Sequence, residues 1–159
     1  MPIDLPTWLV ALLNVAGWPV IQLALAWVFT RLPAKWFQPP REWAWEKHGL
    51  LYESLFAIKR WKDRLPDGAS WFTRGFPKST LKSANPDYLE RFIRETWRGE
   101  LCHWAALACA PVFALWNPPW AIWVMALCGL LLNVPCILAQ RYNRLRLRRL
   151  LEKRFTTLS

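Results

Sequence analysis

LPTWLVALLNVAGWPVIQLALAWVF, residues 5–29, contains no charged side chain. As a helix with a rise of about 1.5 Å per residue, this stretch is roughly 37 Å long, enough to cross a hydrocarbon layer of roughly 30 Å with some tilt. It lacks the basic leading region of a cleaved signal peptide, and its apolar run is longer than the core of one. We therefore interpret residues 5–29 as a retained membrane span rather than a signal peptide.

Two more apolar blocks follow near the C-terminus, at residues 101–116 and 120–139. The intervening Asn117-Pro118-Pro119 cannot continue a helix, which predicts a helical hairpin. The chain of 159 residues is 54% hydrophobic with 13 Trp, yet its net charge is +10, because charged residues gather outside the three blocks. This segregation predicts a single all-α membrane domain, residues 1–159, with about three transmembrane helices plus interfacial amphipathic helices.

The basic residues predict the orientation of these spans. Of 21 Lys and Arg, 14 lie within residues 31–98 and the other seven follow Gln140, whereas none precedes the first span or lies at the hairpin tip. The positive-inside rule therefore places the interfacial segment 31–100 and the basic tail 140–159 in the cytoplasm. We expect a multi-pass protein of the cell membrane, with its N-terminus and hairpin tip outside and its C-terminus cytoplasmic.

The central segment combines charge with many Trp and Phe side chains, which favour the headgroup level of a bilayer. Residues 45–65 predict one amphipathic helix on the membrane surface, or alternatively a helix that packs on a partner domain. Turn residues such as Asp67-Gly68 and Arg74-Gly75 predict a loop over residues 67–85. A helix then starts with Asn85 as its N-cap and Pro86 in its first turn, and we expect it to continue into the second span with Gly99 as a flexible point.

One stripe of that helix carries candidate catalytic groups. Glu95, Gly99 and His103 are four residues apart, and Glu100 precedes His103 by three residues. An ionisable group inside a span is costly, so His103 is a functional candidate, with structural packing as the alternative. We expect His103 to act as a general base and Glu95 or Glu100 to orient its imidazole.

A second group of residues is predicted to bind substrate at the same depth, because three separate stretches reach the cytoplasmic interface there. Guanidinium groups suit the phosphates of an acyl donor or the oxyanion formed in acyl transfer. The candidates are Arg31, Lys47, Arg98, Arg141, Tyr142, Asn143 and Arg144. His48, beside Lys47, is a candidate second acid or base, or else an ordinary interfacial histidine.

Other site chemistries find less support. No GxSxG motif, Gly-rich phosphate loop or nucleotide fingerprint occurs. The four Cys lie in apolar blocks without CxxC spacing, which favours packing over a disulfide framework or a zinc site. Glu100 and His103 match half of a di-iron pattern, but a second pair is missing. We expect no metal and no cofactor.

Seven motifs follow one another along the chain: TRLPAKWF (30–37), WEKHG (45–49), RWK (60–62), DG (67–68), RETWRGELCHW (94–104), NVP (133–135) and QRYNRLR (140–146). In their order and spacing they resemble the glycosyl-4,4'-diaponeurosporenoate acyltransferase family. The resemblance covers residues 30–146, most of the chain. It implies a small membrane enzyme that transfers a fatty acyl group to a sugar hydroxyl on a glycosylated carotenoid carboxylic acid, and we expect acyl-CoA as its co-substrate.

The first hypothesis is therefore a membrane-embedded O-acyltransferase acting at the cytoplasmic leaflet on a glycosylated carotenoid or related lipid. The expected partners are the bilayer, the acyl donor and this acceptor; we expect no nucleic acid, and a homo-oligomer is compatible with the sequence. One alternative is a non-enzymatic lipid-binding or scaffolding subunit of a membrane complex, whose arginines would bind headgroups. Another is a transferase that modifies a lipid by a different reaction.

Overall fold

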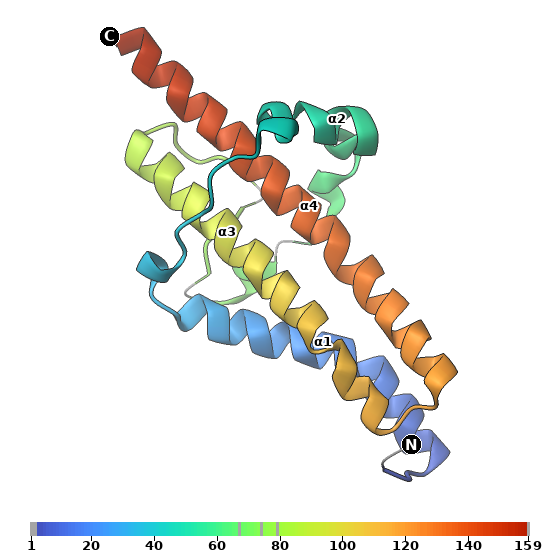
Figure 1. Ribbon diagram of the computed structural model, residues 1–159. Coiled ribbons are helices and arrows are strands. Elements are labelled where there is room, and N and C mark those ends of the chain that lie inside the picture. The colour runs from blue at the N-terminus through green and yellow to red at the C-terminus, as the bar shows by residue number, and fades with distance from the viewer. Residues whose placement is uncertain (1–2, 67, 74, 79, 159) are drawn as a thin grey trace.

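All regular structure is helical in the computed structural model, which describes residues 3–66, 68–73, 75–78 and 80–158 (Figure 1). The α-helices among these residues are α1 (Thr7–Arg31), α2 (Leu50–Phe56), α3 (Pro86–Ala108) and α4 (Pro119–Leu158). Short 3-10 helices lie at Ala34–Trp36, Ala44–Gly49, Ile58–Arg60, Lys62–Arg64, Gly68–Trp71 and Ala110–Leu115. The predicted all-α class is confirmed for the described part of the chain.

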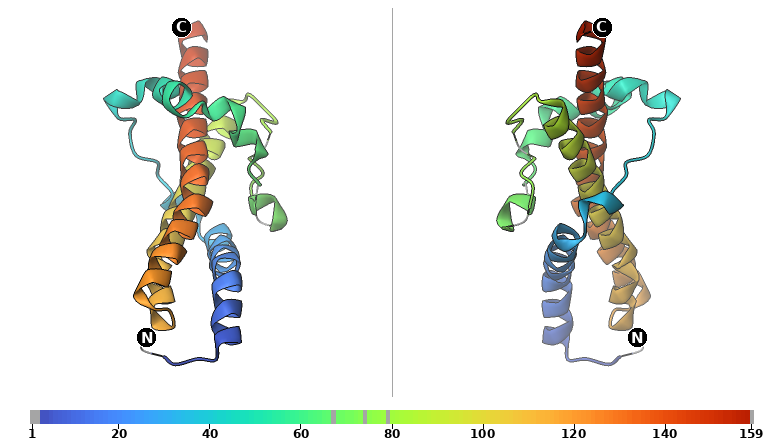
Figure 2. Two further views of the ribbon diagram at one scale, coloured as in Figure 1. Left: turned by 90° about the vertical axis from the view of Figure 1, so that its right-hand side faces the viewer. Right: turned by 90° about the vertical axis from the view of Figure 1, so that its left-hand side faces the viewer.

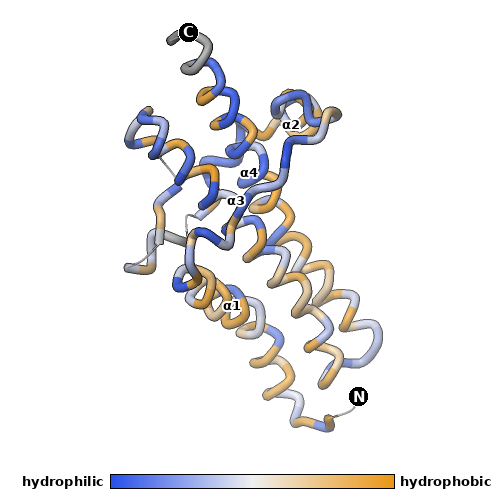
Figure 3. Tube along the Cα trace, turned by 60° about the vertical axis from the view of Figure 1, so that its left-hand side comes forward, coloured by the Kyte–Doolittle hydropathy of each residue, from blue (hydrophilic) through white to orange (hydrophobic). Residues whose placement is uncertain are grey.

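Two of the described helices are long and apolar enough to cross a membrane. These are α1 and the part of α4 from Pro119 to Lys153. Figure 3 shows the hydrophobic residues along α1 and the hairpin half of α4, and the hydrophilic ones toward the other end of α3 and α4. The predicted second span, 101–116, is divided between the last turns of α3 and the 3-10 helix Ala110–Leu115, so three spans stay a prediction.

Helix α3 begins as its sequence predicts. The Asn85 side chain accepts a hydrogen bond from the Asp87 N–H at 3.0 Å, and Pro86 occupies the first helical position, where a missing N–H costs nothing. The helix continues through Gly99 without a break and packs against the antiparallel α4. The two helices pack closely there because Gly99 has no side chain. A Cβ at this position would lie only 3.2 Å from the Gln140 side chain.

The hairpin turn and α4 differ in how well they were predicted. Asn117, 3% exposed, closes the turn by donating to the Phe113 carbonyl at 3.0 Å and exchanging hydrogen bonds with Asn14 of α1. Helix α4 does not end near residue 139, because Pro135 is accommodated and the helix runs on to Leu158. The described part of the predicted basic tail is therefore the second half of a single helix.

Helix α1 packs on the hairpin through one large side chain. Trp18 is 3% exposed, lies against Phe113 and Met125, and donates from its indole N–H to the Met125 carbonyl at 3.1 Å. Its ring also fills the space where a Cβ on Gly129 of α4 would stand. A small residue on one helix thus lets the tryptophan of another approach its backbone, as in many membrane helix pairs.

The predicted single helix over residues 45–65 is wrong, because the backbone turns several times within it. Lys47, His48 and Ala57 have φ values of 47°, 56° and 46°, and Gly49 has 91°. The segment instead folds back over α4 as short helices, which cross it in Figure 2.

Burial explains why this segment folds back. Tyr52 and Ile58 are 3% and 0% exposed and pack on Tyr142 and Leu145 of α4. The predicted loop over 67–85 contains the 3-10 helix Gly68–Trp71 and otherwise follows the prediction where described; Asp67, Arg74 and Ser79 lie outside the described residues.

Candidate active site

His103 lies on the face of α3 that meets α4, and its partner there is Asn133. The distance from His103 Nδ1 to Asn133 Oδ1 is 2.9 Å, and Asn133 is 0% exposed. The Asn133 Nδ2 donates to the Gly129 carbonyl at 2.9 Å, and Gln22 of α1 donates to Oδ1 at 3.5 Å. Three helices thus contribute one polar contact each to an otherwise apolar region.

This arrangement determines which imidazole nitrogen carries the proton. Because the Asn133 amide nitrogen is used as a donor, its oxygen is the acceptor, so His103 Nδ1 must carry a hydrogen. In the neutral imidazole, Nε2 then keeps its lone pair and can accept a proton. The site chemistry available at His103 is therefore that of a base oriented by an amide.

The predicted contact of Glu95 or Glu100 with His103 is not formed, because both carboxylates bind arginines. Glu95 accepts from Arg98 Nη1 at 2.9 and 3.0 Å. Arg98 also donates to the Leu32 carbonyl at 3.0 Å and lies 4.7 Å from the centre of the Phe37 ring. This pair links α3 to the chain that leaves α1.

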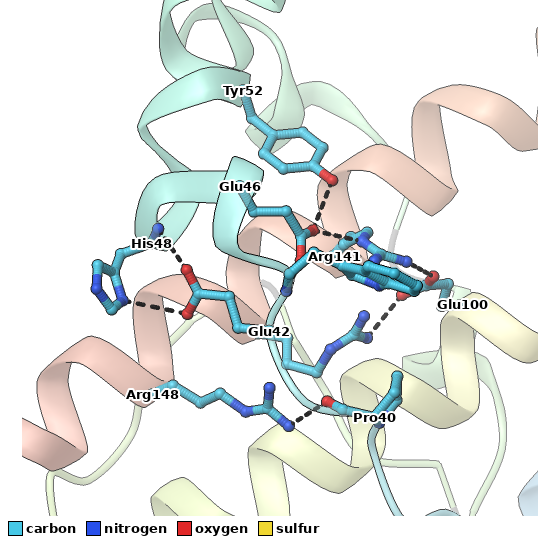
Figure 4. Close-up of polar contacts among 10 residues, drawn as sticks. Pro40, Glu42, Glu46, His48, Tyr52, Glu100, Arg141 and Arg148 are labelled. Carbon is cyan, nitrogen blue, oxygen red and sulfur yellow. Dashed lines mark hydrogen bonds and ion pairs between the residues drawn. The ribbon is translucent and has the colours of Figure 1, made fainter.

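Glu100 belongs to a buried ion cluster, defined by Glu46, Glu100, Arg141 and Arg144. Figure 4 labels Glu46, Glu100 and Arg141 of this cluster. Arg141 Nε lies 2.6 Å from Glu46 Oε1, and Arg141 Nη1 lies 3.2 Å from Glu100 Oε1. Arg144 Nη1 lies 2.6 Å from Glu100 Oε2. Glu46, Glu100 and Arg144 are 1%, 1% and 2% exposed. Two carboxylates balance two guanidinium groups, which is how buried charge is tolerated.

Glu46 joins the central segment to this cluster. Its carboxylate also accepts from the Tyr52 hydroxyl and the Trp43 N–H, both at 2.8 Å. Burial by itself would raise the pKa of Glu46, but the hydrogen bonds from Arg141, Trp43 and Tyr52 outweigh it and hold the pKa below its ordinary value. Burial and the adjacent Glu46 carboxylate raise the pKa of Tyr52. Glu46 is therefore ionised and Tyr52 is neutral at physiological pH.

The His103–Asn133 pair and the buried ion cluster lie at two different levels along the hairpin. On α3, Glu100 precedes His103 by three residues, about 4.5 Å of helix rise. On α4, Asn133 precedes Arg141 by eight residues, about 12 Å. The predicted single pocket of imidazole, carboxylates and guanidinium groups is therefore two polar groups at different depths. That Arg98, Arg141 and Arg144 hold substrate stays a prediction.

Two more predicted substrate residues lie on α4. The buried Tyr142 donates from its hydroxyl to Glu53 at 2.8 Å and packs on Tyr52, so it anchors the central segment. Asn143 is half-buried and lines a pocket beside α3.

The remaining predicted residues lie apart from His103. The His48 side chain is 57% exposed, with Nδ1 3.1 Å from Glu42, and its carbonyl accepts from Arg149. Arg31 covers the Trp27 ring of its own helix, 3.8 Å from the ring centre, and Lys47 is exposed. The structure does not bring His48, Lys47 or Arg31 to the imidazole of His103.

The sequence-based prediction missed Glu46, Gln22 and Asn133 as site residues. Glu46 and Asn133 lie in the WEKHG and NVP motifs, and Gln22 and Asn133 are polar residues inside apolar stretches, a signal of interhelical hydrogen bonding. Among the described residues no group of His, Cys, Asp and Glu could hold a metal ion, and the four Cys are free thiols.

These features define a class: a small protein whose described residues form helices, two of them apolar and of membrane-spanning length, with a histidine–asparagine pair between helices. The family profile described as glycosyl-4,4'-diaponeurosporenoate acyltransferase matches residues 33–153, and the chain belongs to this family. It is an acyltransferase, which favours the enzyme over the scaffolding alternative and over transferases of other groups.

Curated relatives agree with this assignment. Glycosyl-4,4'-diaponeurosporenoate acyltransferases from Staphylococcus aureus strains USA300 and NCTC 8325 / PS 47 are each 33% identical over 138 residues. The aligned region covers 84% of this chain and 83% of each relative. No solved structure matches the chain.

Proposed function

We propose that this chain is a membrane-embedded O-acyltransferase that moves a fatty acyl group from acyl-CoA to a hydroxyl of a glycosylated carotenoid, or a related lipid, at the cytoplasmic leaflet. The family name supports acyl transfer and this class of acceptor. The observation that carries the mechanism is the His103–Asn133 pair, a base of fixed tautomer in an apolar region.

His103 acts in this mechanism through Nε2. The nitrogen accepts the proton of the acceptor hydroxyl while the hydroxyl oxygen attacks the thioester carbonyl carbon. When the tetrahedral intermediate collapses, the carbon–sulfur bond breaks and the imidazolium returns the proton to the leaving thiolate. Asn133 holds the ring by accepting from Nδ1–H, so the same nitrogen, Nε2, serves both proton transfers.

Replacement of His103 tests this mechanism. Purified protein in lipid nanodiscs would be supplied with acyl-CoA and a glycosylated carotenoid acid, and the ester product would be measured by mass spectrometry. Losing a general base costs about 10² to 10⁴ in rate, so His103→Ala is expected to lose at least about a hundredfold. His48→Ala, which removes the exposed histidine beside Glu42, is expected to keep most of the activity. Near wild-type turnover by His103→Ala would refute the role.

The proposed topology has three crossings: α1, residues 101–116 and the first part of α4. It places the N-terminus and the hairpin turn outside, and the central segment and C-terminus in the cytoplasm, because basic residues concentrate in the latter two. Alkaline phosphatase is active only outside the cytoplasm. A fusion at Asn117 is expected to be active and one after the last residue inactive; the opposite pattern would overturn the orientation.

A further inference from the structure

A pocket beside α3 and α4 combines positive charge with an apolar wall, and the mechanism above does not use it. We call it the basic niche. Its polar lining residues are Lys62, Lys78, Asn143 and Arg146, and its apolar ones are Leu81, Phe92, Leu147 and Leu150. Three cations and an amide donor therefore converge from the central segment and α4.

Two cations of the basic niche, Lys62 and Arg146, are available to an anionic ligand. Lys62 pairs with Asp63, but the Lys62 side chain is 11% exposed whereas that of Asp63 is 72% exposed, so water screens the carboxylate more than the ammonium. Arg146 is exposed and lies on α4 beyond the buried ion cluster. Such a niche favours a ligand with several negative charges.

The basic niche also lies within the length of an acyl donor from the His103–Asn133 pair. Asn143 of the niche and Asn133 beside His103 are ten residues apart on the continuous α4, about 15 Å. A pantetheine arm, about four to five residue lengths of extended chain, spans roughly 13–18 Å. Phosphates in the niche thus leave a thioester within reach of His103.

We propose that the basic niche binds the phosphate groups of a phosphopantetheine thioester donor such as acyl-CoA, with Arg146 and Lys62 as its main charged ligands. This inference rests on the proposed function, because it identifies where that function takes its donor. It differs from the sequence-based prediction, in which the arginines of the buried ion cluster had this role: those arginines bind buried carboxylates, whereas Lys62 and Arg146 line a cavity.

Titration of free coenzyme A into the purified protein, in nanodiscs of zwitterionic phosphatidylcholine, tests the proposal. Arg146→Gln is expected to weaken binding about tenfold, the loss of one charge-assisted contact at a partly exposed site. Arg41→Gln, the same change at an exposed arginine outside the niche, is the matched control and is expected to leave binding unchanged. In the transfer assay, Arg146→Gln is expected to raise KM for acyl-CoA about tenfold with little change in kcat.

Two comparisons separate the niche from the proposed function and from lipid binding. His103→Ala is expected to bind coenzyme A normally while losing turnover. If wild-type protein binds coenzyme A through Arg146 but transfers no acyl group, the niche is supported and the proposed function is refuted. Equal coenzyme A affinity and KM in Arg146→Gln and wild type would overturn the niche. So would an Arg146 effect confined to retention on phosphatidylglycerol vesicles, which would make it a headgroup site.

Discussion

Glu100→Gln is expected to destabilise the protein strongly, because it removes one carboxylate from the buried ion cluster. The side chains of Arg144 and Glu100 are 3% and 1% exposed, so the substitution leaves the Arg144 guanidinium buried without its carboxylate, whereas Arg141 keeps Glu46. Breaking a buried pair from one side costs about 3–5 kcal/mol. Arg144 retains the Trp97 ring at 5.0 Å, a contribution of about 1 kcal/mol, so we expect about 3 kcal/mol.

Thermal unfolding of the purified protein in detergent measures this change. About 3 kcal/mol corresponds to a decrease in Tm of roughly 6–12 °C for a chain of this length. Glu90→Gln, an exposed glutamate on the same helix α3, is the control and is expected to move Tm by no more than about 1 °C. The double variant Glu100→Gln/Arg144→Gln removes both charges and is expected to recover part of the loss. The electrostatic reasoning is refuted if Glu100→Gln has the same Tm as the Glu90→Gln control, or if the double variant has a lower Tm than Glu100→Gln alone.

Three further predictions concern other contacts. Asn133→Leu removes the acceptor for His103 Nδ1 and is expected to lower kcat about tenfold, with no further loss when added to His103→Ala; an equal loss in both backgrounds would contradict a positioning role. Gly129→Ala places a methyl group against the Trp18 ring and is expected to lower stability by about 1–3 kcal/mol, whereas Gly68→Ala, with open space around it, should not. The lowered pKa of Glu46 stabilises the fold fully above its unfolded-state value of 4.5 and progressively less as pH falls through the lower folded-state value. Tm should therefore decrease as the pH drops below about 4.5, and this decrease should be smaller in Glu46→Gln.

Elements of the fold that depend on neighbouring residues were predicted correctly. Asn85 and Pro86 start α3, and the turn at Asn117 and Pro118 reverses the chain, because capping hydrogen bonds and the missing proline N–H act within a few residues. The apolar stretch of α1 needs no tertiary partner to be helical, since helix formation satisfies its own backbone groups.

The path of the central segment depended on distant contacts. Its apolar spacing favours one helix, but Glu42 binds the His48 backbone N–H and Arg149 donates to the His48 carbonyl, where the backbone has positive φ. The tyrosines Tyr52 and Tyr142 are buried together only when this segment folds over α4. The contacts with Arg149 and Tyr142 join residues about ninety to a hundred positions apart, so helical periodicity within the segment does not report them.

The sequence by itself determined which residues carry charge or hydrogen-bonding groups beside the apolar stretches, including His103, Glu100 and Arg141. Only the tertiary structure decided how they pair, because α4 brings two arginines to Glu100 and an asparagine to His103. A buried carboxylate is stabilised most by a full opposite charge, and a neutral imidazole needs only an acceptor for its N–H. Helical spacing predicts which side chains share a face; the partner helix determines which of them meet.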